Sequence, residues 1–295
     1  MQSKQKGTPK KKVSKKLCVG LKRDTIDKYY TKQSIVDLCI YHISNNINID
    51  AKNDLIIEPS AGSGAFITGI KSLSSKFLFF DLKPENEQII QQDYLELDAV
   101  NLRAITGPNR IHVIGNPPFG RQSSLAIKFI KKSSTFADTI SFILPKSFKK
   151  ESLKKAYPLD FHLVFQADLP RNSFLVDGRE YDVPCVFQIW EKRDTIRDLE
   201  AILEPIHFKF VKQNENPDIS VRRIGVNAGV ISQNTLDKSV ESHYFIKFTN
   251  SKSIEDNITS LSGITYEFDN TVGPKSISKQ ELIAKFNPLL SIKID

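Results

Sequence analysis

The sequence predicts an α/β fold with a mostly parallel sheet covered on both faces by helices, followed by a smaller α+β region. Between residues 33 and 192, short apolar runs alternate with segments of helical periodicity, which is typical of parallel strands joined by crossover helices. After about residue 204 the chain changes to short strand-like pieces and one closing helix. A length of 295 residues suits one large domain with an appended module.

Within the first region, each predicted element follows from its local pattern. Residues 33–46 carry Ile35, Leu38, Cys39 and Ile43 at helical spacing, and residues 123–134 form a second helical candidate. The expected strands are short apolar runs bounded by turn residues. They lie at 54–60, 76–81, 111–116, 139–144, 161–169 and 183–190.

Towards the end of this region the sheet is expected to become antiparallel. Asp177-Gly178 is a strong turn dipeptide between two strand-like runs, so it predicts a terminal hairpin. In the carboxyl-terminal region, strand-like pieces occur at 206–212, 219–226, 243–249 and 264–268. Ser278 and Glu281 stand in capping-box register, which marks the start of the closing helix.

Composition and charge narrow the class of protein. The chain is 40% hydrophobic and 26% charged, as in ordinary globular proteins, and no apolar run approaches the roughly 18–20 residues of a bilayer-spanning helix. The amino terminus lacks a secretory signal, so we expect an intracellular protein, cytoplasmic or nuclear, with no membrane partner. Cys18, Cys39 and Cys185 are too few and too scattered for a disulfide framework or a metal site, and we expect buried thiols and no metal.

The net charge of +8 is concentrated at the amino terminus. Residues 1–16 hold seven lysines and no acidic residue, which leaves 8 − 7 = +1 for the rest of the chain. We expect residues 1–20 to be disordered. They form either a solvated tail, a segment that binds the phosphates of a nucleic acid, or a nuclear import signal.

The first candidate site is the glycine-containing loop "EPSAGSGAF" at residues 58–66. A strand is expected to end at Ile57, and Gly62 and Gly64 then allow close approach of a ligand to the backbone before a helix begins. Asp81 ends the next strand, 23 residues after Glu58, at a distance typical of an acid that binds ribose hydroxyls. Asp93 is a further acceptor, suited to an adenine amino group. The loop matches neither the phosphate-binding pattern GxxxxGK[ST] nor the spacing GxGxxG. This favours a nucleoside ligand without a pyrophosphate.

The second candidate site is "GNPPF" at residues 115–119. Together with the glycine loop in front of it, this segment resembles class I S-adenosylmethionine-dependent methyltransferases that act on amino groups, most closely the adenine-N(6) methyltransferases of nucleic acids. The resemblance covers residues 28–192, and the order of its motifs is similar to the gamma group of DNA enzymes. It implies a Rossmann-like, doubly wound, seven-stranded fold over residues 21–203, with residues 204–295 as an accessory or substrate-recognition region.

The resemblance also implies roles for individual residues. Asn116 and the carbonyl of Pro117 would accept the two protons of the target amine, and Pro118 would stiffen the turn. Phe119 would stack on the base, with Phe174 as a second aromatic contact. Cofactor-binding positions are implied at Tyr30, Thr31, Glu58, Pro59, Ser60, Ala61, Gly62, Gly64, Asp81, Asp93 and Asn116.

Several readings stay open on the sequence alone. DNA is favoured as the substrate, while RNA is the alternative, through a cap-adjacent adenosine or guanine-N(2) of ribosomal RNA. Methylation of a protein glutamine and a non-catalytic nucleic-acid-binding subunit are further options. Arg222, Arg223, Lys275 and Lys279 are candidates for phosphate contacts. A methyltransferase-like partner subunit or a homodimer is compatible with the sequence.

Overall fold

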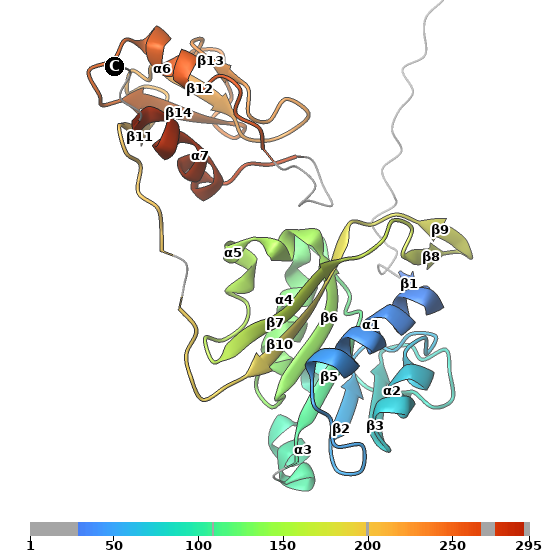
Figure 1. Cartoon of the computed structure of the whole chain (residues 1–295). Coiled ribbons are helices and arrows are strands. Elements are labelled where there is room, and N and C mark those ends of the chain that lie inside the picture. The colour runs from blue at the N-terminus through green and yellow to red at the C-terminus, as the bar shows by residue number, and fades with distance from the viewer. Residues whose placement is uncertain (1–28, 108, 199–200, 267–274, 292–295) are drawn as a thin grey trace, which may run out of the picture.

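The structure is a computed structural model that describes residues 29–107, 109–198, 201–266 and 275–291. A seven-stranded sheet with flanking helices precedes residue 193, and a four-stranded sheet with two helices follows residue 207 (Figure 1). The lysine-rich segment and Cys18 lie outside the described residues. Within the described part, no helix is both long enough and apolar enough to cross a bilayer.

The main sheet confirms the predicted mostly parallel α/β fold. Its strand order is β4-β3-β2-β5-β6-β10-β7, in which only β10 runs antiparallel to its two neighbours. Each apolar run predicted to be a strand is found in it. The strands are β2 (Leu55–Glu58), β3 (Lys76–Asp81), β4 (Ile90–Gln91), β5 (Ile111–Gly115), β6 (Thr139–Pro145), β7 (Phe161–Asp168) and β10 (Cys185–Lys192).

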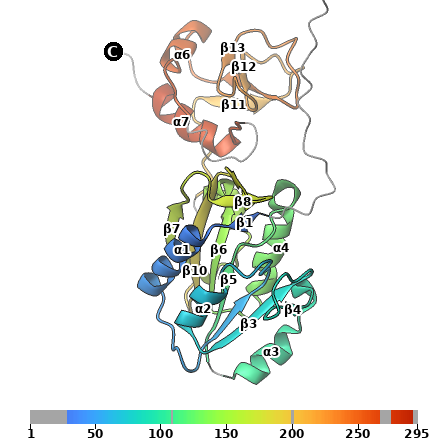
Figure 2. The same cartoon turned by 90° about the vertical axis from the view of Figure 1, so that its right-hand side faces the viewer.

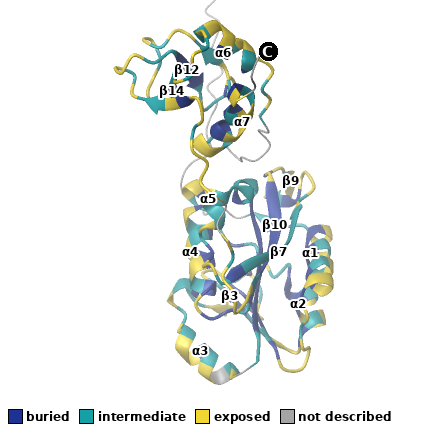
Figure 3. Ribbon diagram, turned by 60° about the vertical axis from the view of Figure 1, so that its left-hand side comes forward, coloured by how far each residue is buried: buried dark blue, intermediate teal, exposed yellow. Residues whose placement is uncertain are grey.

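Helices cover both faces of this sheet because successive strand residues point to opposite sides. Ile56 packs with the helices on one face, and its neighbour Ile57 packs with those on the other. Figure 3 shows the buried strands between helices whose outer surfaces are exposed. The first face carries α1 (Gln33–Asn46) and α2 (Ile67–Leu73), and the second carries α3 (Ala99–Thr106) and α4 (Ser124–Ser133).

The strand order reverses between β2 and β5, and this reversal locates the site. From β2 the chain proceeds outward to β3 and β4, then returns to β5 on the other side of β2. The helices after β2 and β5 therefore leave in opposite directions and open a crevice at the carboxyl ends of these strands. Glu58 ends β2 and Asn116 follows β5, so both candidate motifs meet there.

A small second sheet, which the sequence analysis did not predict, lies next to this crevice. It consists of β1 (Tyr30–Thr31), β8 (Phe174–Val176) and β9 (Arg179–Tyr181), in the order β1-β8-β9 (Figure 1). Figure 2 shows β8 next to β1. Asp177 and Gly178 both have positive φ (50° and 73°) in the turn between β8 and β9, as a two-residue hairpin requires. The predicted turn is thus confirmed, but its hairpin belongs to this cap sheet. The antiparallel end of the main sheet is formed by β7 and β10 instead.

The carboxyl-terminal region has its own core. Its strands run in the order β11-β14-β12-β13, and α6 and α7 complete an apolar cluster with them. Ser278 and Glu281 exchange the two hydrogen bonds of a capping box at the start of α7, as predicted. The elements are β11 (Phe208–Val211), β12 (Ile219–Arg222), β13 (Ile231–Ser232), β14 (His243–Phe248), α6 (Ile254–Ser260) and α7 (Lys279–Ser291).

Two further expectations can be compared with the structure. The strand expected at 264–268 is wrong for its described part, because Ile264 to Tyr266 form no strand. Cys39 and Cys185 are free and buried, as expected, and burial raises the pKa of both thiols. A raised thiol pKa leaves them protonated and unreactive at neutral pH.

Arg197 joins the end of the main sheet domain to its core, and its removal tests the packing there. Its Nε and Nη2 donate to the carbonyls of Phe161 (2.8 Å) and Tyr157 (2.9 Å), and its guanidinium lies 5.3 Å from the Trp190 ring centroid. We expect Arg197→Ala to lower the free energy of unfolding by about 2–3 kcal/mol, because it leaves buried carbonyls without donors. Denaturant unfolding measures this change, and Arg193→Ala, at a neighbouring exposed arginine, should cost less than about 1 kcal/mol.

Candidate functional site

A cavity of about 380 Å³ opens beyond the carboxyl ends of β2 and β5. It brings together the two motifs that the sequence analysis singled out, although they are far apart in the chain. All predicted site residues except Gly64 and Phe174 line it. They are Tyr30, Thr31, Glu58, Pro59, Ser60, Ala61, Gly62, Asp81, Asp93, Asn116, Pro117, Pro118 and Phe119.

The glycine loop is anchored on the acid that ends β3. Gly62 has φ +52°, and its N–H donates to Asp81 Oδ2 at 2.8 Å. The other oxygen of Asp81 accepts from the N–H of Lys83 at 2.8 Å. Gly64 does not line the cavity. It shapes the loop, because a Cβ there would stand 2.6 Å from Ile67 Cδ1. The loop and Asp81 therefore form one preorganised unit.

Glu58 places a carboxylate at the bottom of the cavity in an unfavourable environment. The residue is only 2% exposed, and its Oε2 has no hydrogen-bond partner among the residues that the structure describes. Burial, and secondarily the charge of Asp81, raises the pKa of the Glu58 carboxyl to about 8. A buried acceptor without a donor costs about 1–3 kcal/mol, so this carboxyl is suited to a ligand that brings a donor or a positive charge.

Gly115, at the end of β5, belongs to the predicted "GNPPF" segment, but the sequence analysis gave it no role of its own. It has φ +154°, and a Cβ there would stand 3.3 Å from Glu58 Cγ and 3.5 Å from Pro59 Cδ. The missing side chain thus lets β5 approach the Glu58 carboxyl closely. Its signal in the sequence was its position directly before Asn116.

Replacing Gly115 tests whether this close approach matters for ligand binding. We expect Gly115→Ala to lower the free energy of unfolding by about 1–3 kcal/mol and to weaken cofactor binding by roughly tenfold, because the new methyl group displaces Glu58. Gly107→Ala is the matched control: that glycine has φ +64° but no atom within 4 Å of a built Cβ. It should lose stability without losing affinity. Equal losses of affinity in both variants would contradict this role.

Asn116 presents an acceptor to the cavity. Its Nδ2 donates to the carbonyl of Tyr29 and to the hydroxyl of Thr31, both at 3.2 Å. Its Oδ1 is buried and has no partner among the described residues. Because both partners of the amino end are acceptors, the amide orientation follows from the hydrogen bonds. A neutral acceptor is therefore held ready for an N–H or O–H group of a ligand.

The segment after Asn116 is fixed by proline and by the next helix. Pro117 and Pro118 both line the cavity, and a proline ring restricts its own φ and the residue before it. Within the described chain, nothing donates to the carbonyl of Pro117. The carbonyl of Phe119 accepts from Leu125 N (3.1 Å) and Ala126 N (3.3 Å) in the first turn of α4. These restraints hold the acceptors without a cost of reorganisation during a reaction.

Aromatic rings form one wall of the cavity. Tyr29 stacks on Phe119 with ring centroids 6.1 Å apart, and on Tyr181 at 5.6 Å. The sequence analysis missed Tyr29, although Tyr29 is the neighbour of Tyr30, a predicted cofactor-binding position. The prediction that Phe174 contacts a base is corrected: Phe174 is fully buried, packs against Tyr29 and does not line the cavity. It supports the wall from behind.

The remaining polar residues of the cavity have structural partners as well. The hydroxyl of Tyr30 donates to the carboxylate of Glu85 at 2.7 Å, and Glu85 N donates to Gly62 O at 3.1 Å. Asp93 Oδ1 accepts from Leu95 N at 2.9 Å at the start of a short 3₁₀ turn. One oxygen of Asp93 is therefore already used by the protein.

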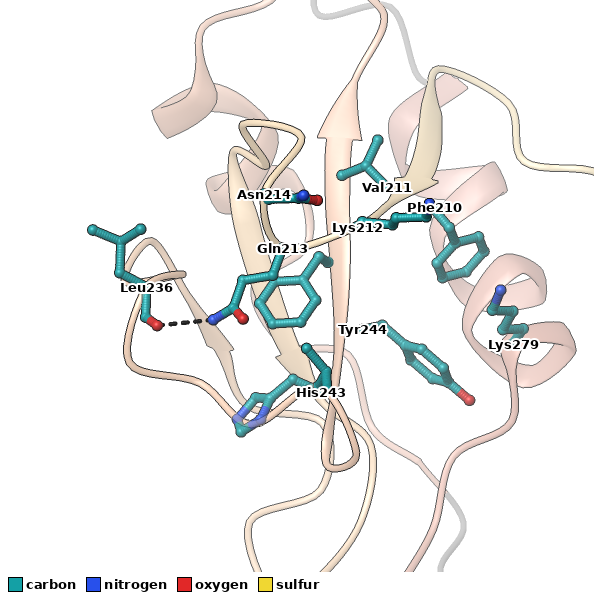
Figure 4. Close-up of a pocket in the computed structure, with 11 residues that line it drawn as sticks. Phe210, Val211, Lys212, Gln213, Asn214, Leu236, His243, Tyr244 and Lys279 are labelled. Carbon is teal, nitrogen blue, oxygen red and sulfur yellow. Dashed lines mark hydrogen bonds between the residues drawn. The ribbon is translucent and has the colours of Figure 1, made fainter.

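A second cavity, of about 680 Å³, lies in the carboxyl-terminal region (Figure 4). It is larger but wide open, and its central amide is satisfied by the protein itself. Gln213 Nε2 donates to the carbonyls of Thr235 and Leu236, each at 2.8 Å. Lys279, a candidate phosphate contact, lies 4.7 Å from the Phe210 ring centroid.

The other candidate phosphate contacts, Arg222, Arg223 and Lys275, do not line this cavity. Arg222 is partly buried and donates through Nε to the carbonyl of Ile224, while Arg223 is exposed and lies 5.5 Å from the Tyr244 ring centroid. Lys275 is exposed. No cluster of three or more His, Cys, Asp or Glu side chains able to hold a metal ion occurs among residues 29–107, 109–198, 201–266 and 275–291.

Comparison with known proteins gives likenesses of fold only. No family model matches the sequence, and no curated protein matches it. A candidate RNA methyltransferase from Pyrococcus horikoshii is 14% identical with a TM-score of 0.43, and the match covers 57% of this chain and 88% of that one. An rRNA methylase from Streptococcus thermophilus is 14% identical (TM-score 0.34, covering 55% and 95%). A candidate methyltransferase from Streptococcus mutans, in complex with SAH, is 16% identical (TM-score 0.34, covering 53% and 96%). At this level such likenesses say nothing of activity.

Proposed function

We propose that this chain is an S-adenosylmethionine-dependent methyltransferase that methylates the 6-amino group of adenine in nucleic acid. The observation that carries the proposal is the buried, unpartnered Oδ1 of Asn116 at the switch point of the sheet. A donor group of the ligand, such as an amine N–H, satisfies this acceptor. The resemblance of "EPSAGSGAF" and "GNPPF" to adenine-N(6) enzymes supports the choice of amine.

The residues around the glycine loop fit a cofactor with a cationic end and a nucleoside end. Glu58 offers an unpartnered carboxylate oxygen for the cation, and Asp81 offers carboxylate lone pairs beside Gly62 for ribose hydroxyls. Asp93 lies at the rim for the amino group of an adenine ring. S-adenosylmethionine supplies a methyl group on sulfonium sulfur, which an amine nitrogen can accept by direct displacement.

The protein's part in the reaction is to bind and orient the amine. The exocyclic nitrogen of adenine is a weak nucleophile because its lone pair is delocalised into the ring. Two fixed acceptors, Asn116 Oδ1 and the carbonyl of Pro117, hold its hydrogens and favour a geometry with the lone pair free. Orientation of the amine towards the methyl group then accounts for most of the rate enhancement, and no covalent enzyme intermediate is needed.

The aromatic wall explains how a base is held. A paired base cannot present its amino group, so the target is flipped out or already unpaired. Phe119 and Tyr29 offer flat apolar surfaces at the acceptors, and base stacking contributes about 1–3 kcal/mol. DNA remains the favoured polymer because of the gamma-like motif order, with RNA as the alternative.

A panel of acceptors tests the proposal. The protein is incubated with methyl-labelled S-adenosylmethionine and, in parallel, duplex DNA, single-stranded DNA, uncapped RNA and capped RNA, and incorporation of the label is counted. We expect label in at least one of the four, and transfer about 10²–10³-fold slower with Asn116→Ala. Calorimetry on the same sample measures cofactor binding. Cofactor binding without transfer to any acceptor would favour a non-catalytic binding subunit.

A further inference from the structure

We infer that Thr31 is a positioning residue for Asn116, whereas the family resemblance implies a cofactor contact for it. The inference rests on the proposed function only for its effect on rate. Its basis is the hydrogen bond from Asn116 Nδ2 to Thr31 Oγ1 at 3.2 Å. Thr31 lines the cavity but is only 8% exposed, and its hydroxyl oxygen accepts from Asn116.

The hydrogen bonds of the Asn116 side chain account for its orientation completely. An amide nitrogen has two protons to donate. In this structure one goes to the carbonyl of Tyr29 and the other to the hydroxyl of Thr31. The amide oxygen is then directed away from both and remains unpartnered. Residues 29 and 31 together therefore select which end of the amide faces the ligand.

The strand that carries Thr31 is itself fixed at several points. Thr31 pairs with Phe174 in β8, and the N–H of Lys32 donates to the carbonyl of Ser173 at 3.1 Å. Lys32 also forms an ion pair with Glu180 in β9. The cap sheet thus holds β1 against the end of β5, and the Thr31 hydroxyl transmits this constraint to Asn116.

The same strand is also bound to the glycine loop. Tyr30 donates to Glu85, whose backbone N–H donates to the carbonyl of Gly62. The ring of Tyr30 lies over Gly62, 3.8 Å from where a Cβ would be. Tyr30 and Thr31 point to opposite sides of β1, so one strand positions the glycine loop with one residue and the amine acceptor with the next.

Two substitutions of Thr31 separate the effect of its hydroxyl from the effect of its side-chain volume. Thr31→Val keeps the shape and removes the acceptor, while Thr31→Ser keeps the acceptor. We expect Thr31→Val to lower kcat about tenfold, as expected for a lost hydrogen bond, with the Kd for S-adenosylmethionine and the Tm nearly unchanged. Thr31→Ser should restore kcat to within about threefold of the native protein.

A second readout does not depend on activity. NMR measures hydrogen exchange of the Asn116 side-chain amide, whose signals are assigned by their absence in Asn116→Ala. We expect exchange to accelerate about tenfold in Thr31→Val and to stay native in Thr31→Ser. This result would support the positioning role even if no acceptor were methylated, in which case the proposed function alone would fail.

Three results would overturn the inference. Unchanged amide exchange in Thr31→Val would show that the hydroxyl does not hold Asn116. A raised Kd for S-adenosylmethionine with a native kcat at saturating cofactor would make Thr31 a cofactor contact. Equal loss of kcat in Thr31→Ser and Thr31→Val would show that the hydroxyl is not the group responsible.

Discussion

Replacing Asn116 with alanine should lower the rate of methyl transfer at saturating cofactor by about 10²–10³-fold, the usual cost of removing one preorganised polar contact to the reacting group. The Oδ1 of Asn116 is buried and free of protein partners, so its loss removes a ligand contact and breaks no hydrogen bond of the folded protein through that oxygen. Only the two bonds of Nδ2, to Tyr29 and Thr31, are lost from the protein. We therefore expect the fold to survive.

The control for this variant is another asparagine at the surface. Asn45, near the end of α1, is exposed and donates to the carbonyl of Tyr41 at 2.9 Å. Asn45→Ala should transfer methyl groups at the native rate. Single-turnover measurements with preloaded cofactor separate the chemical step from binding. A native single-turnover rate in Asn116→Ala would remove Asn116 from the reaction.

Replacing Glu58 with glutamine should weaken cofactor binding and remove the part of its pH dependence that this carboxyl causes. The folded pKa of Glu58 is about 8, so most of the carboxyl is protonated at neutral pH in the free protein. A cation in the site favours the carboxylate, and its binding then releases a proton. Below pH 8 the affinity of the native protein should fall by up to tenfold per pH unit. Glu58→Gln should lose this slope and bind roughly 10–100-fold more weakly at pH 8.5.

The same substitution should stabilise the free protein at high pH. The pKa of Glu58 is about 8 in the folded state, against 4.5 for a glutamate in water. Between these values the folded state binds more protons than the unfolded state, so this group's contribution to stability falls as pH rises, by about 5 kcal/mol at most. Glu58→Gln has no carboxyl to ionise. Above pH 8 it should therefore be more stable than the native protein.

Calorimetry across pH 6 to 9 and denaturant unfolding at the same values test both effects. The α-amino group of the cofactor titrates near pH 8 as well, but it does so equally for both proteins, and the difference isolates Glu58. Glu241→Gln, which removes an exposed carboxylate in the carboxyl-terminal region, is the control. Identical pH slopes in Glu58→Gln and the native protein would refute the role of this carboxyl.

The fold of the first domain could be predicted because its strands are buried on both faces and read as apolar runs. Residues 76–81 form β3 as predicted, and the run predicted at 111–116 forms β5, which ends one residue earlier. Since parallel strands place their carboxyl ends at one edge, the sequence also indicated that Glu58 and Asn116 would meet. The cap sheet was missed because β1 has only two residues, too few for any periodicity, and depends on pairing with β8.

The details of the site depend on contacts that no local pattern contains. Phe174 and Phe119 look alike in sequence, but pairing with β1 buries the first behind Tyr29, while the prolines hold the second at the cavity. Likewise, the close packing of Gly115 against Glu58 follows from the register of β2 and β5, in which Leu55 pairs with Ile111, 111 − 55 = 56 positions away in the chain. The residue types indicated the chemistry, whereas the pairing of distant strands determines which side chains line the cavity.

The most direct test of the proposed chemistry is mass analysis of nucleosides from the nucleic acid that accepts label. The native protein, labelled S-adenosylmethionine and the best acceptor of the panel are incubated, and the polymer is digested to nucleosides. We predict that the label appears in N(6)-methyladenine, and that Asn116→Ala yields none above background. Label on a ring carbon, a ribose oxygen or a guanine amino group would contradict the assignment of the 6-amino group of adenine as the target.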